Sequence, residues 1–272
     1  MSTVYIEKPT EHISVITMNR PERLNAMSAE LILDLCEAFK QVSDDNNTWI
    51  VILTGAGRAF CSGLDLEDHG LVPSIDGLTL PPIGMRSVEH FGKVVPALRA
   101  VRQPVIAVIN GPAYGGGMCL SLGADIRIAE ESAVFNATGI VNGLTSTELG
   151  ASFMLPRLIG ASHSFDIMLT GRTVDATEAK DMGLISRLVP DGKGMDTAFD
   201  IAEKMLKFSH YGLEMTKQTL WANLEVPGLQ AAIDLENRNQ LLLGLTDNLP
   251  ECMTARKEKR EPVYEDQPRN FD

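Results

Sequence analysis

Cysteine is scarce in this sequence, and the few cysteines present are not grouped. The 272 residues contain four cysteines and five histidines, with no CxxC pair and no cysteine–histidine cluster. The spacing that structural zinc sites and small disulfide frameworks require is therefore missing. Scattered thiols of this kind are typical of a chain that works in a reducing compartment. The four cysteines are Cys36, Cys61, Cys119 and Cys252.

Basic residues are outnumbered, and long apolar runs are absent. Against 36 acidic residues stand 24 basic ones, which gives a formal net charge of −12. This balance argues against nucleic acid or an anionic membrane as a partner, so an anionic ligand would need a local basic patch. No window approaches the roughly 18 apolar residues of a membrane span. Residues 1–20 alternate and carry charges, so we expect neither a signal peptide nor an anchor and predict a cytoplasmic protein.

Apolar residues make up 44% of the chain, enough for one large core. Residues 4–8 and 12–20 alternate as a strand hairpin would, and Ser28 is placed to cap a helix that follows it. Two unbroken apolar runs predict strands that are covered on both faces. These runs are residues 49–55 and 104–111, and further strands are expected at residues 125–131 and 133–135. Strands that alternate with helices predict an α/β core with crossover connections.

The last part of the chain is predicted to be mainly helical. Helical segments are expected from residue 146 onward, with apolar stripes on most of them and a strongly charged last helix near Leu249–Arg260. We therefore divide the chain into a core, residues 1–195, and a C-terminal helical region, residues 196–272. Residues 68–85 hold several glycines and prolines with little periodicity, so a long surface loop is expected there.

The stretch "NGPAYGGGMCLSLGAD", residues 110–125, has three consecutive glycines between a predicted strand and a predicted helix. A phosphate-binding P-loop would need lysine and a hydroxyl residue where Gly117 and Met118 stand. The hydrolase nucleophile elbow would need glycine at Cys119. The earlier segment "GAGRAF" would need glycine at Phe60 to bind a dinucleotide. All three readings fail.

A strand that ends in glycines and opens a helix presents backbone N–H groups that have no partner within the helix. Glycine also lets a ligand carbonyl approach the backbone closely. Such a turn can supply half of an oxyanion hole, and "AFCSGLD", residues 59–65, is a candidate for the other half. A glycine turn after a buried strand often serves packing alone. The two segments together are therefore stronger evidence for an oxyanion hole than either segment by itself.

These segments, in this order and spacing, resemble the crotonase (enoyl-CoA hydratase/isomerase) superfamily. The resemblance runs through "NRPERLNAMS", "GRAFCSGLDL", "PVIAVINGPAYGGGMCLSLGADIRIA", "LPRLIG", "LTGRTVDATEAKDMGLISRLVP" and "ARKEKREP". It implies an α/β fold, a spiral of ββα turns with a C-terminal helical trimerisation region. It also implies an acyl-CoA thioester as substrate and a homotrimer or a dimer of trimers. Coenzyme A is then part of the substrate, and no prosthetic group is expected.

The resemblance also assigns roles to residues. The backbone N–H groups of Leu64 and Gly116 would hold the thioester oxygen, and backbone carbonyls of Ser62 and Leu64 would accept from the adenine. Arg23 and Lys259 stand where the family often has cations near the coenzyme phosphates. For these two cations, an ordinary solvated surface position is the alternative. Arg256 stands where the family usually has an aromatic residue, so the acyl end of the pocket is expected to differ.

The two glutamates with which hydratases of this family activate water are missing. Cys119 stands at the first position and Gly139 at the second. A thiol in an apolar run stays protonated and is a poor general base, so we expect Cys119 to be a packed core residue.

One acid stands at a meaningful place. Glu148 precedes Pro156 by eight residues, an offset that resembles the single catalytic glutamate of Δ3,Δ2-enoyl-CoA isomerases. Desolvation would raise its pKa and suit it to take and return one proton. The alternatives are that Glu148 is a surface or first-turn residue, or that the base lies in the segment just past the first oxyanion segment. The candidates there are Glu67, Asp68 and His69.

The sequence therefore predicts an enzyme that shifts the double bond of an enoyl-CoA, with Leu64, Gly116 and Glu148 as its catalytic groups. Two alternatives stay open. One is an enoyl-CoA hydratase with a non-standard carboxylate, and the other is an acyl-CoA-binding protein without catalytic activity.

Overall fold

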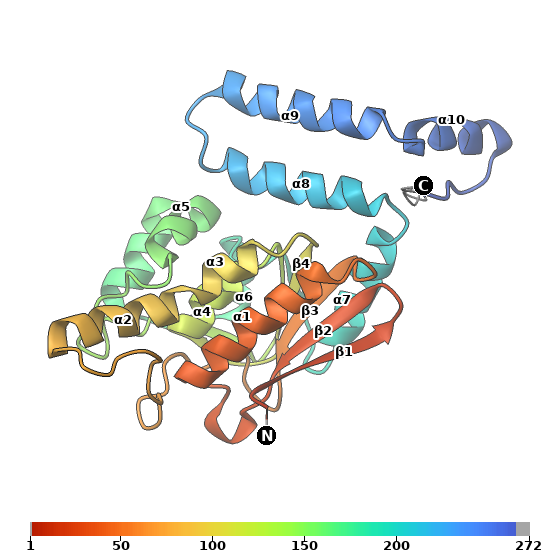
Figure 1. Cartoon of the computed structure of the whole chain (residues 1–272). Helices are drawn as coiled ribbons and strands as arrows, with labels where there is room; N and C mark the ends of the chain where they lie inside the picture. Colours follow the sequence, from red (N-terminus) through yellow and green to blue (C-terminus); the bar gives the residue numbers. More distant parts are fainter. Residues whose placement is uncertain (1, 265–272) are drawn as a thin grey trace.

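A six-stranded sheet forms the centre of the molecule (Figure 1). The structure is a computed structural model that describes residues 2–264. In spatial order the sheet contains β1 (Val4–Thr10), β2 (Ile13–Met18), β3 (Ile50–Gly55), β4 (Val105–Ile109), β6 (Ile126–Glu130) and β9 (Arg187–Val189). The β1–β2 pair is an antiparallel hairpin and every other neighbouring pair is parallel. The predicted hairpin and the predicted strands are confirmed.

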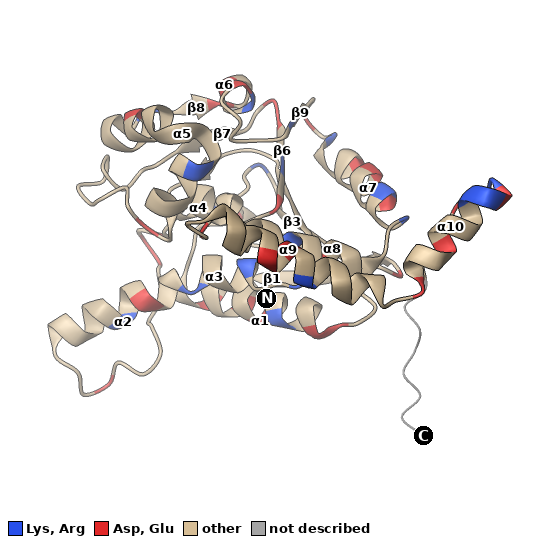
Figure 2. Cartoon of the chain, turned by 90° about the horizontal axis from the view of Figure 1, so that it is seen from above, with Lys and Arg blue, Asp and Glu red and all other residues tan. Residues whose placement is uncertain are grey.

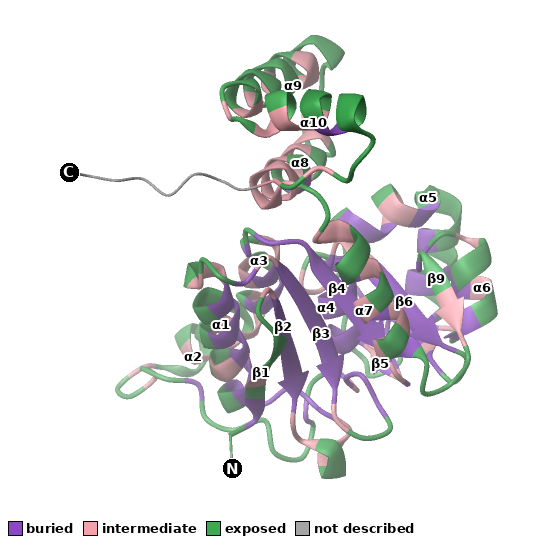
Figure 3. Cartoon of the chain, turned by 90° about the vertical axis from the view of Figure 1, so that its right-hand side faces the viewer, coloured by how far each residue is buried: buried purple, intermediate pink, exposed green. Residues whose placement is uncertain are grey.

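The strands β2, β3 and β4 are buried along their whole length, because helices cover both faces of the sheet (Figure 3). Successive residues of a strand point to opposite faces. Val51 and Leu53 therefore pack in the larger core, while Ile50 and Ile52 pack in a smaller one. The continuous apolar runs in the sequence follow from this two-sided burial.

The larger core contains helices from several parts of the chain. These are α1 (Ala29–Asp44), α3 (Val94–Arg99), α4 (Gly116–Leu122), α5 (Ala151–Thr170) and α6 (Ala176–Asp181). The Ser28 side chain accepts from the N–H of Leu31 and caps α1, as predicted. The opposite face of the sheet is covered by α7 (Gly194–Met205), which buries Ala198 and Ala202 against it.

A second, three-stranded sheet lies next to the glycine-rich turn. It contains β5 (Ala113–Tyr114), β7 (Val134–Asn136) and β8 (Val174–Asp175). Because β5 directly precedes Gly115 and α4, this small sheet fixes the entry into the turn.

Two expected boundaries are wrong. The segment 68–85 is not a loop throughout, because α2 (Leu80–Gly92) begins inside it. Pro81 and Pro82 lie in its first turn, where a missing N–H costs the helix nothing. The helix expected from residue 146 begins only at Ala151, because Leu149 and Gly150 have positive φ angles of 47° and 86°. Gly160, with φ 78°, interrupts α5 further along.

The last helices project from the core as an arm (Figures 1 and 3). The arm consists of α8 (His210–Asn223), α9 (Leu229–Gly244) and α10 (Asn248–Glu258). The predicted division after residue 195 falls inside α7, which packs on the sheet, so the projecting part begins at α8. Within the described residues, no helix has the length and apolarity that crossing a membrane requires.

Candidate active site

The two glycine-containing segments that the sequence singles out lie side by side. They follow the parallel neighbours β3 and β4, and parallel strands deliver the segments after them to the same edge of a sheet. The N–H of Cys61 donates to the carbonyl of Pro112 over 3.1 Å, and the N–H of Tyr114 donates to the carbonyl of Cys61 over 3.0 Å. Backbone hydrogen bonds therefore join segments that are about fifty residues apart in the sequence.

Two glycines make this close approach possible. A Cβ atom at Gly63, where φ is 88°, would lie 2.7 Å from the carbonyl oxygen of Tyr114. A Cβ atom at Gly117 would collide with the carbonyl group of Cys61. Both obstacles are backbone atoms, so neither can move aside as a flexible side chain would. Glycine is needed at both positions because the two segments pack backbone against backbone.

The backbone N–H groups of Leu64 and Gly116 are free in the part of the chain that the structure describes. Met27 pairs with the carbonyl of Gly63 and with the N–H of Asp65, which turns the Leu64 N–H to the other side. Gly116 is the first residue of α4, where N–H groups have no acceptor within the helix. The sequence prediction placed a pair of donors at these two residues, and the structure leaves both available.

Glu148 lies next to the same turn. Its Oε1 atom is 3.3 Å from the point that a Cβ atom on Gly115 would occupy. The carboxylate is half-buried, and burial raises its pKa above the ordinary value. No described residue donates a hydrogen bond to it. An unpaired carboxyl group with a raised pKa, beside two free backbone donors, is suited to accept a proton and to return it.

The backbone holds Glu148 in this position. The Sγ of Cys119 donates to the carbonyl of Glu148 over 3.6 Å, and the N–H of Ala151 donates to the same carbonyl over 2.8 Å. The following residue, Leu149, directs its Cδ1 atom to within 3.1 Å of the Cβ position of Gly116. Sequence reasoning did not foresee this turn, because nothing in "TELGA" marks Leu149 as left-handed.

The structure also shows what occupies the two hydratase positions. Cys119 is 1% exposed, and burial raises the pKa of its thiol well above the ordinary value, so the group is a neutral, packed thiol. At Gly139 a Cβ atom would collide with the carbonyl of Thr145. This backbone conformation therefore excludes a carboxylate side chain at residue 139.

The alternative candidates for the base are more exposed to solvent than Glu148. Glu67, Asp68 and His69 are all exposed on the segment after Leu64. Glu67 is ion-paired with Arg23 over 2.6 Å, and the His69 ring contacts the carbonyl of Gly70. In this conformation none of them is desolvated as Glu148 is.

Asp65 is a residue that sequence reasoning missed. Its side chain is 1% exposed and pairs with Arg20 over 2.9 Å and with Arg23 over 2.6 Å. The hydrogen bond from Arg23 is the main reason why the pKa of Asp65 is lowered far below its usual range. These two ion pairs of Asp65 fix the position of the backbone directly after Leu64. The sequence signal was the acid that ends "AFCSGLD" together with the two arginines of "NRPER".

The predicted coenzyme contacts are not gathered at one place in a single chain. Ser62 is half-buried beside Leu64, and its N–H donates to the carbonyl of Leu24. Arg23 is already paired with Asp65 and Glu67. Lys259 directly follows α10, and the views of Figures 1 and 2 both place α10 far from α4.

A cavity of about 650 Å³ lies beside Leu149 and Gly150. Its walls come from the α2–α3 junction, from the first turns of α5 and from Trp221 of α8. Most of the lining is apolar, with Val95, Phe153 and Met154 among the residues. Leu149 contacts the Gly116 turn on one side and lines the cavity on the other, so this side chain lies between the turn and the apolar space. Among the described residues, no group of three or more His, Cys, Asp or Glu side chains could hold a metal ion.

Comparison with known proteins identifies the family of this chain. Residues 8–267 match the family model described as enoyl-CoA hydratase/isomerase. The chain belongs to the enoyl-CoA hydratase/isomerase family. It shares the crotonase fold of that family, and the resemblance seen in the sequence is confirmed.

Relatives within the family are named for different activities. A Mycobacterium bovis protein named probable enoyl-CoA hydratase echA12 is 50% identical over 267 residues, which cover 98% of this chain and 94% of that protein. The crystal structure of a probable enoyl-CoA hydratase/isomerase from Mycobacterium abscessus superposes with a TM-score of 0.93, 45% identity and coverage of 98% and 100%. A monofunctional enoyl-CoA isomerase from M. smegmatis has a TM-score of 0.72 and 42% identity, covering 86% of this chain and 99% of that one.

Proposed function

We propose that this member of the enoyl-CoA hydratase/isomerase family is an enoyl-CoA isomerase that uses Glu148 as its single acid/base. The observation that carries the proposal is the position of Glu148, an unpaired carboxyl group beside the Gly115–Gly116 turn. The two family positions for water-activating glutamates hold a neutral thiol and a glycine that tolerates no side chain. One carboxylate suffices for a double-bond shift.

The proposed reaction begins when a 3-enoyl-CoA places its thioester oxygen between the N–H groups of Leu64 and Gly116. Glu148 removes a proton from C2, and the charge that develops on the thioester oxygen is stabilised by the two N–H groups. The protonated Glu148 exchanges its proton with solvent in part and then delivers a proton to C4 or back to C2, and delivery to C4 moves the C=C bond from C3 to C2. The thioester is unchanged, no water is consumed, and the carboxylate is regenerated.

We propose that the acyl chain extends past Leu149 into the 650 Å³ cavity, whose apolar lining suits a hydrocarbon. The backbone carbonyls of Ser62 and Leu64 would accept from the adenine. We assign the phosphate contact to Lys259 of a neighbouring protomer, because α10 is remote from α4 within one chain (Figure 2). Arg23 would meet a phosphate only by sharing its ion pairs with Asp65 and Glu67.

Self-association fits the arm. Among the described residues, α9 buries none of its side chains, and exposed leucines continue into the turn after it. These exposed leucines include Leu229, Leu241, Leu242 and Leu245. Exposed apolar residues grouped on a helix are typical of an interface with another protein. We propose a homotrimer, alone or as a dimer of trimers, assembled through the arm.

Hydration is the second candidate, because the M. bovis relative is named a probable enoyl-CoA hydratase. One experiment separates the possibilities. A 3-enoyl-CoA and a 2-enoyl-CoA are each incubated with the protein in D₂O, and products are analysed by mass and by NMR. Isomerisation gives the conjugated thioester with deuterium exchange at C2, whereas hydration adds the mass of one water. If the protein binds acyl-CoA but neither exchange nor product forms, the proposed isomerase activity is wrong and a binding protein without catalytic activity is indicated.

A further inference from the structure

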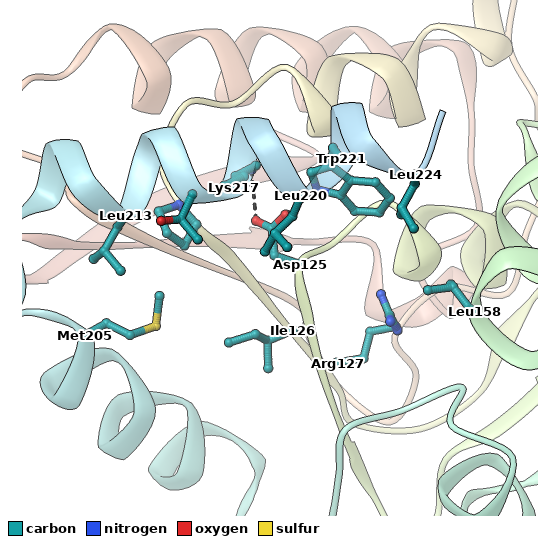
Figure 4. Close-up of a pocket in the computed structure, with 12 residues that line it drawn as sticks. Asp125, Ile126, Arg127, Leu158, Met205, Leu213, Lys217, Leu220, Trp221 and Leu224 are labelled. Atoms are coloured by element: carbon teal, nitrogen blue, oxygen red, sulfur yellow. Dashed lines mark hydrogen bonds and ion pairs between the residues drawn. The ribbon is translucent and has the colours of Figure 1, made fainter. Parts of the chain in front are cut away.

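A second cavity, of about 300 Å³, lies between α8 and the strand β6 (Figure 4). It is lined by leucines of α5 and α8 together with Asp125, Arg127 and Lys217. None of the residues that form the Gly115–Glu148 site contributes to it, although Trp221 lines both this cavity and the larger one. The proposed isomerase mechanism uses none of its charged groups.

Arg127 is a largely buried cation that the nearby Asp125 carboxylate attracts without a direct ion pair. Its side chain donates to the carbonyls of Leu184 and Ala124, each over 2.7 Å, and it forms no ion pair with any described residue. The residue is only 7% exposed, and its Nη2 group donates to no described atom. Figure 4 shows its side chain extending from β6 toward Leu158 and Leu224. Burial lowers the pKa of Arg127 to about 10, so the guanidinium is charged at neutral pH.

The one carboxylate among the residues that line this cavity, Asp125, already has hydrogen-bond and ion-pair partners. Asp125 pairs with Lys217 over 2.9 Å, accepts from the Trp221 indole over 2.6 Å and accepts from the Val105 N–H over 2.6 Å. The Lys217 ammonium also donates to the carbonyl of Gln103. Lys217 and Arg127 are two cations beside the single carboxylate of Asp125, so the lining of this cavity carries one excess positive charge. An anion in the cavity would neutralise this excess charge.

We propose that this cavity is a ligand site for a small amphipathic monocarboxylate, bound with its carboxylate on the Arg127 guanidinium and its apolar body along Leu158, Leu220 and Leu224. A guanidinium is the side chain best suited to the planar geometry of a carboxylate. At about 30 Å³ for each non-hydrogen atom, the cavity holds about ten such atoms. That size matches a saturated carboxylate of eight carbons, with its two oxygens included.

The test uses octanoate as probe and tryptophan fluorescence as readout. The chain has two tryptophans, and Trp49 stacks between His12 and His210, with ring centroids 3.8 and 4.7 Å apart. In the full-length Trp49→Phe protein, Trp221 at the cavity is the single reporter. We expect octanoate to change its emission saturably, and the neutral analogue 1-octanol to bind at least 10-fold more weakly. Equal affinity for octanol, or no saturation with octanoate, would overturn the proposal.

A variant with a carboxylate added beside the guanidinium tests the role of Arg127. Leu224 is 44% exposed, so Leu224→Glu adds a carboxylate beside the guanidinium without burying a new charge. We expect this variant to bind octanoate at least 10-fold more weakly than the matched control Leu224→Gln, which loses the same leucine without gaining a charge. Unchanged affinity in a folded Leu224→Glu protein would contradict the proposal. If that variant does not fold, the comparison of octanoate with octanol still tests whether the cavity prefers a carboxylate.

Because Trp221 also lines the larger cavity, the titration is repeated with saturating octanoyl-CoA. Octanoate that still binds occupies a separate site, whereas octanoate displaced by octanoyl-CoA occupies the substrate cavity and the proposal is wrong. All readouts are binding measurements, so they are independent of whether Glu148 catalyses isomerisation.

Discussion

Replacing Glu148 by glutamine removes the carboxylate and keeps the shape of the side chain. No described residue donates to this carboxylate, so the substitution breaks no internal hydrogen bond. The backbone position of residue 148 depends on Cys119 and Ala151, which bond to its carbonyl and are unaffected. We therefore expect Glu148→Gln to fold normally and to bind acyl-CoA with nearly unchanged affinity.

Turnover of a 3-enoyl-CoA should fall by about 10²–10⁴-fold, the usual contribution of a general acid/base. That range corresponds to about 3–5 kcal/mol in activation free energy. The loss should appear in kcat, since the contacts proposed to bind the substrate are made by other residues.

The pH dependence has a definite sign. Glu148 must be ionised to take the C2 proton, so wild-type activity should fall as the pH drops through its raised pKa. The same shift lowers the stability of the wild type, because ionisation is less favourable in the folded than in the unfolded protein. Below the ordinary pKa of 4.5 this cost is absent, and it grows as the pH rises through the folded-state pKa. Glu148→Gln should therefore gain stability relative to wild type as the pH rises.

The assay follows formation of the conjugated thioester and, separately, deuterium exchange at C2. Asp68→Asn is the matched control, since Asp68 is an exposed acid on the segment after Leu64, and it should retain wild-type turnover. Calorimetry with a saturated acyl-CoA checks binding in both variants. If Glu148→Gln exchanges the C2 proton as fast as wild type, the assignment of the base is refuted. Loss of activity in Asp68→Asn would point to that residue instead.

Four further predictions follow from the packing. Cys119→Ala should lower the free energy of unfolding by about 1 kcal/mol and leave isomerase turnover within a few-fold, as chemical denaturation and kinetics can check; a large loss of turnover in the folded variant would make the thiol a participant. Gly117→Ala forces a Cβ against the Cys61 carbonyl and should lower turnover by on the order of 10²-fold, measured beside circular dichroism to show that the protein is folded. Met154→Trp fills the larger cavity and should reduce kcat/KM for long acyl chains more than for short ones; an equal reduction for all chains would argue against an acyl chain in this cavity. Light scattering should report a trimer or hexamer, and Leu242→Asp should shift it toward monomer; a wild-type monomer at micromolar concentration would remove the assembly proposal.

Much of the fold could be predicted because burial leaves a clear trace in the sequence. The buried strands β3 and β4 have continuous apolar sequences, and the hairpin of β1 and β2 was predicted from short alternating segments, although β2 is buried on both faces. The start of α2 was missed because Pro81 and Pro82 are ordinary breakers, except in a first turn. The start of α5 was placed five residues early because a left-handed Leu149 has no sequence signature.

The candidate site was predictable to the extent that it is built from glycines. Gly63 and Gly117 have physical reasons to be glycine that hold in any sequence with this backbone pairing. The proximity of Glu148 to Gly115 depends on a turn between distant elements, which only the three-dimensional structure displays. The buried pair of Asp65 with two arginines was hidden for a related reason, since its members are about forty residues apart.

The pairing of Cys61 with residues 112–114 has a consequence for how such an enzyme can change over evolution. The proposed donors are main-chain groups, and main-chain hydrogen bonds hold the segments that carry them, so no substitution except one to proline removes either donor directly. The stabilisation of a negative thioester oxygen is thus inherited with the backbone. A proton-transfer group, in contrast, is a single side chain that one codon change can add or delete. If the proposed site is correct, new reactions on this backbone are accessible by moving one carboxylate, without rebuilding the two proposed donors.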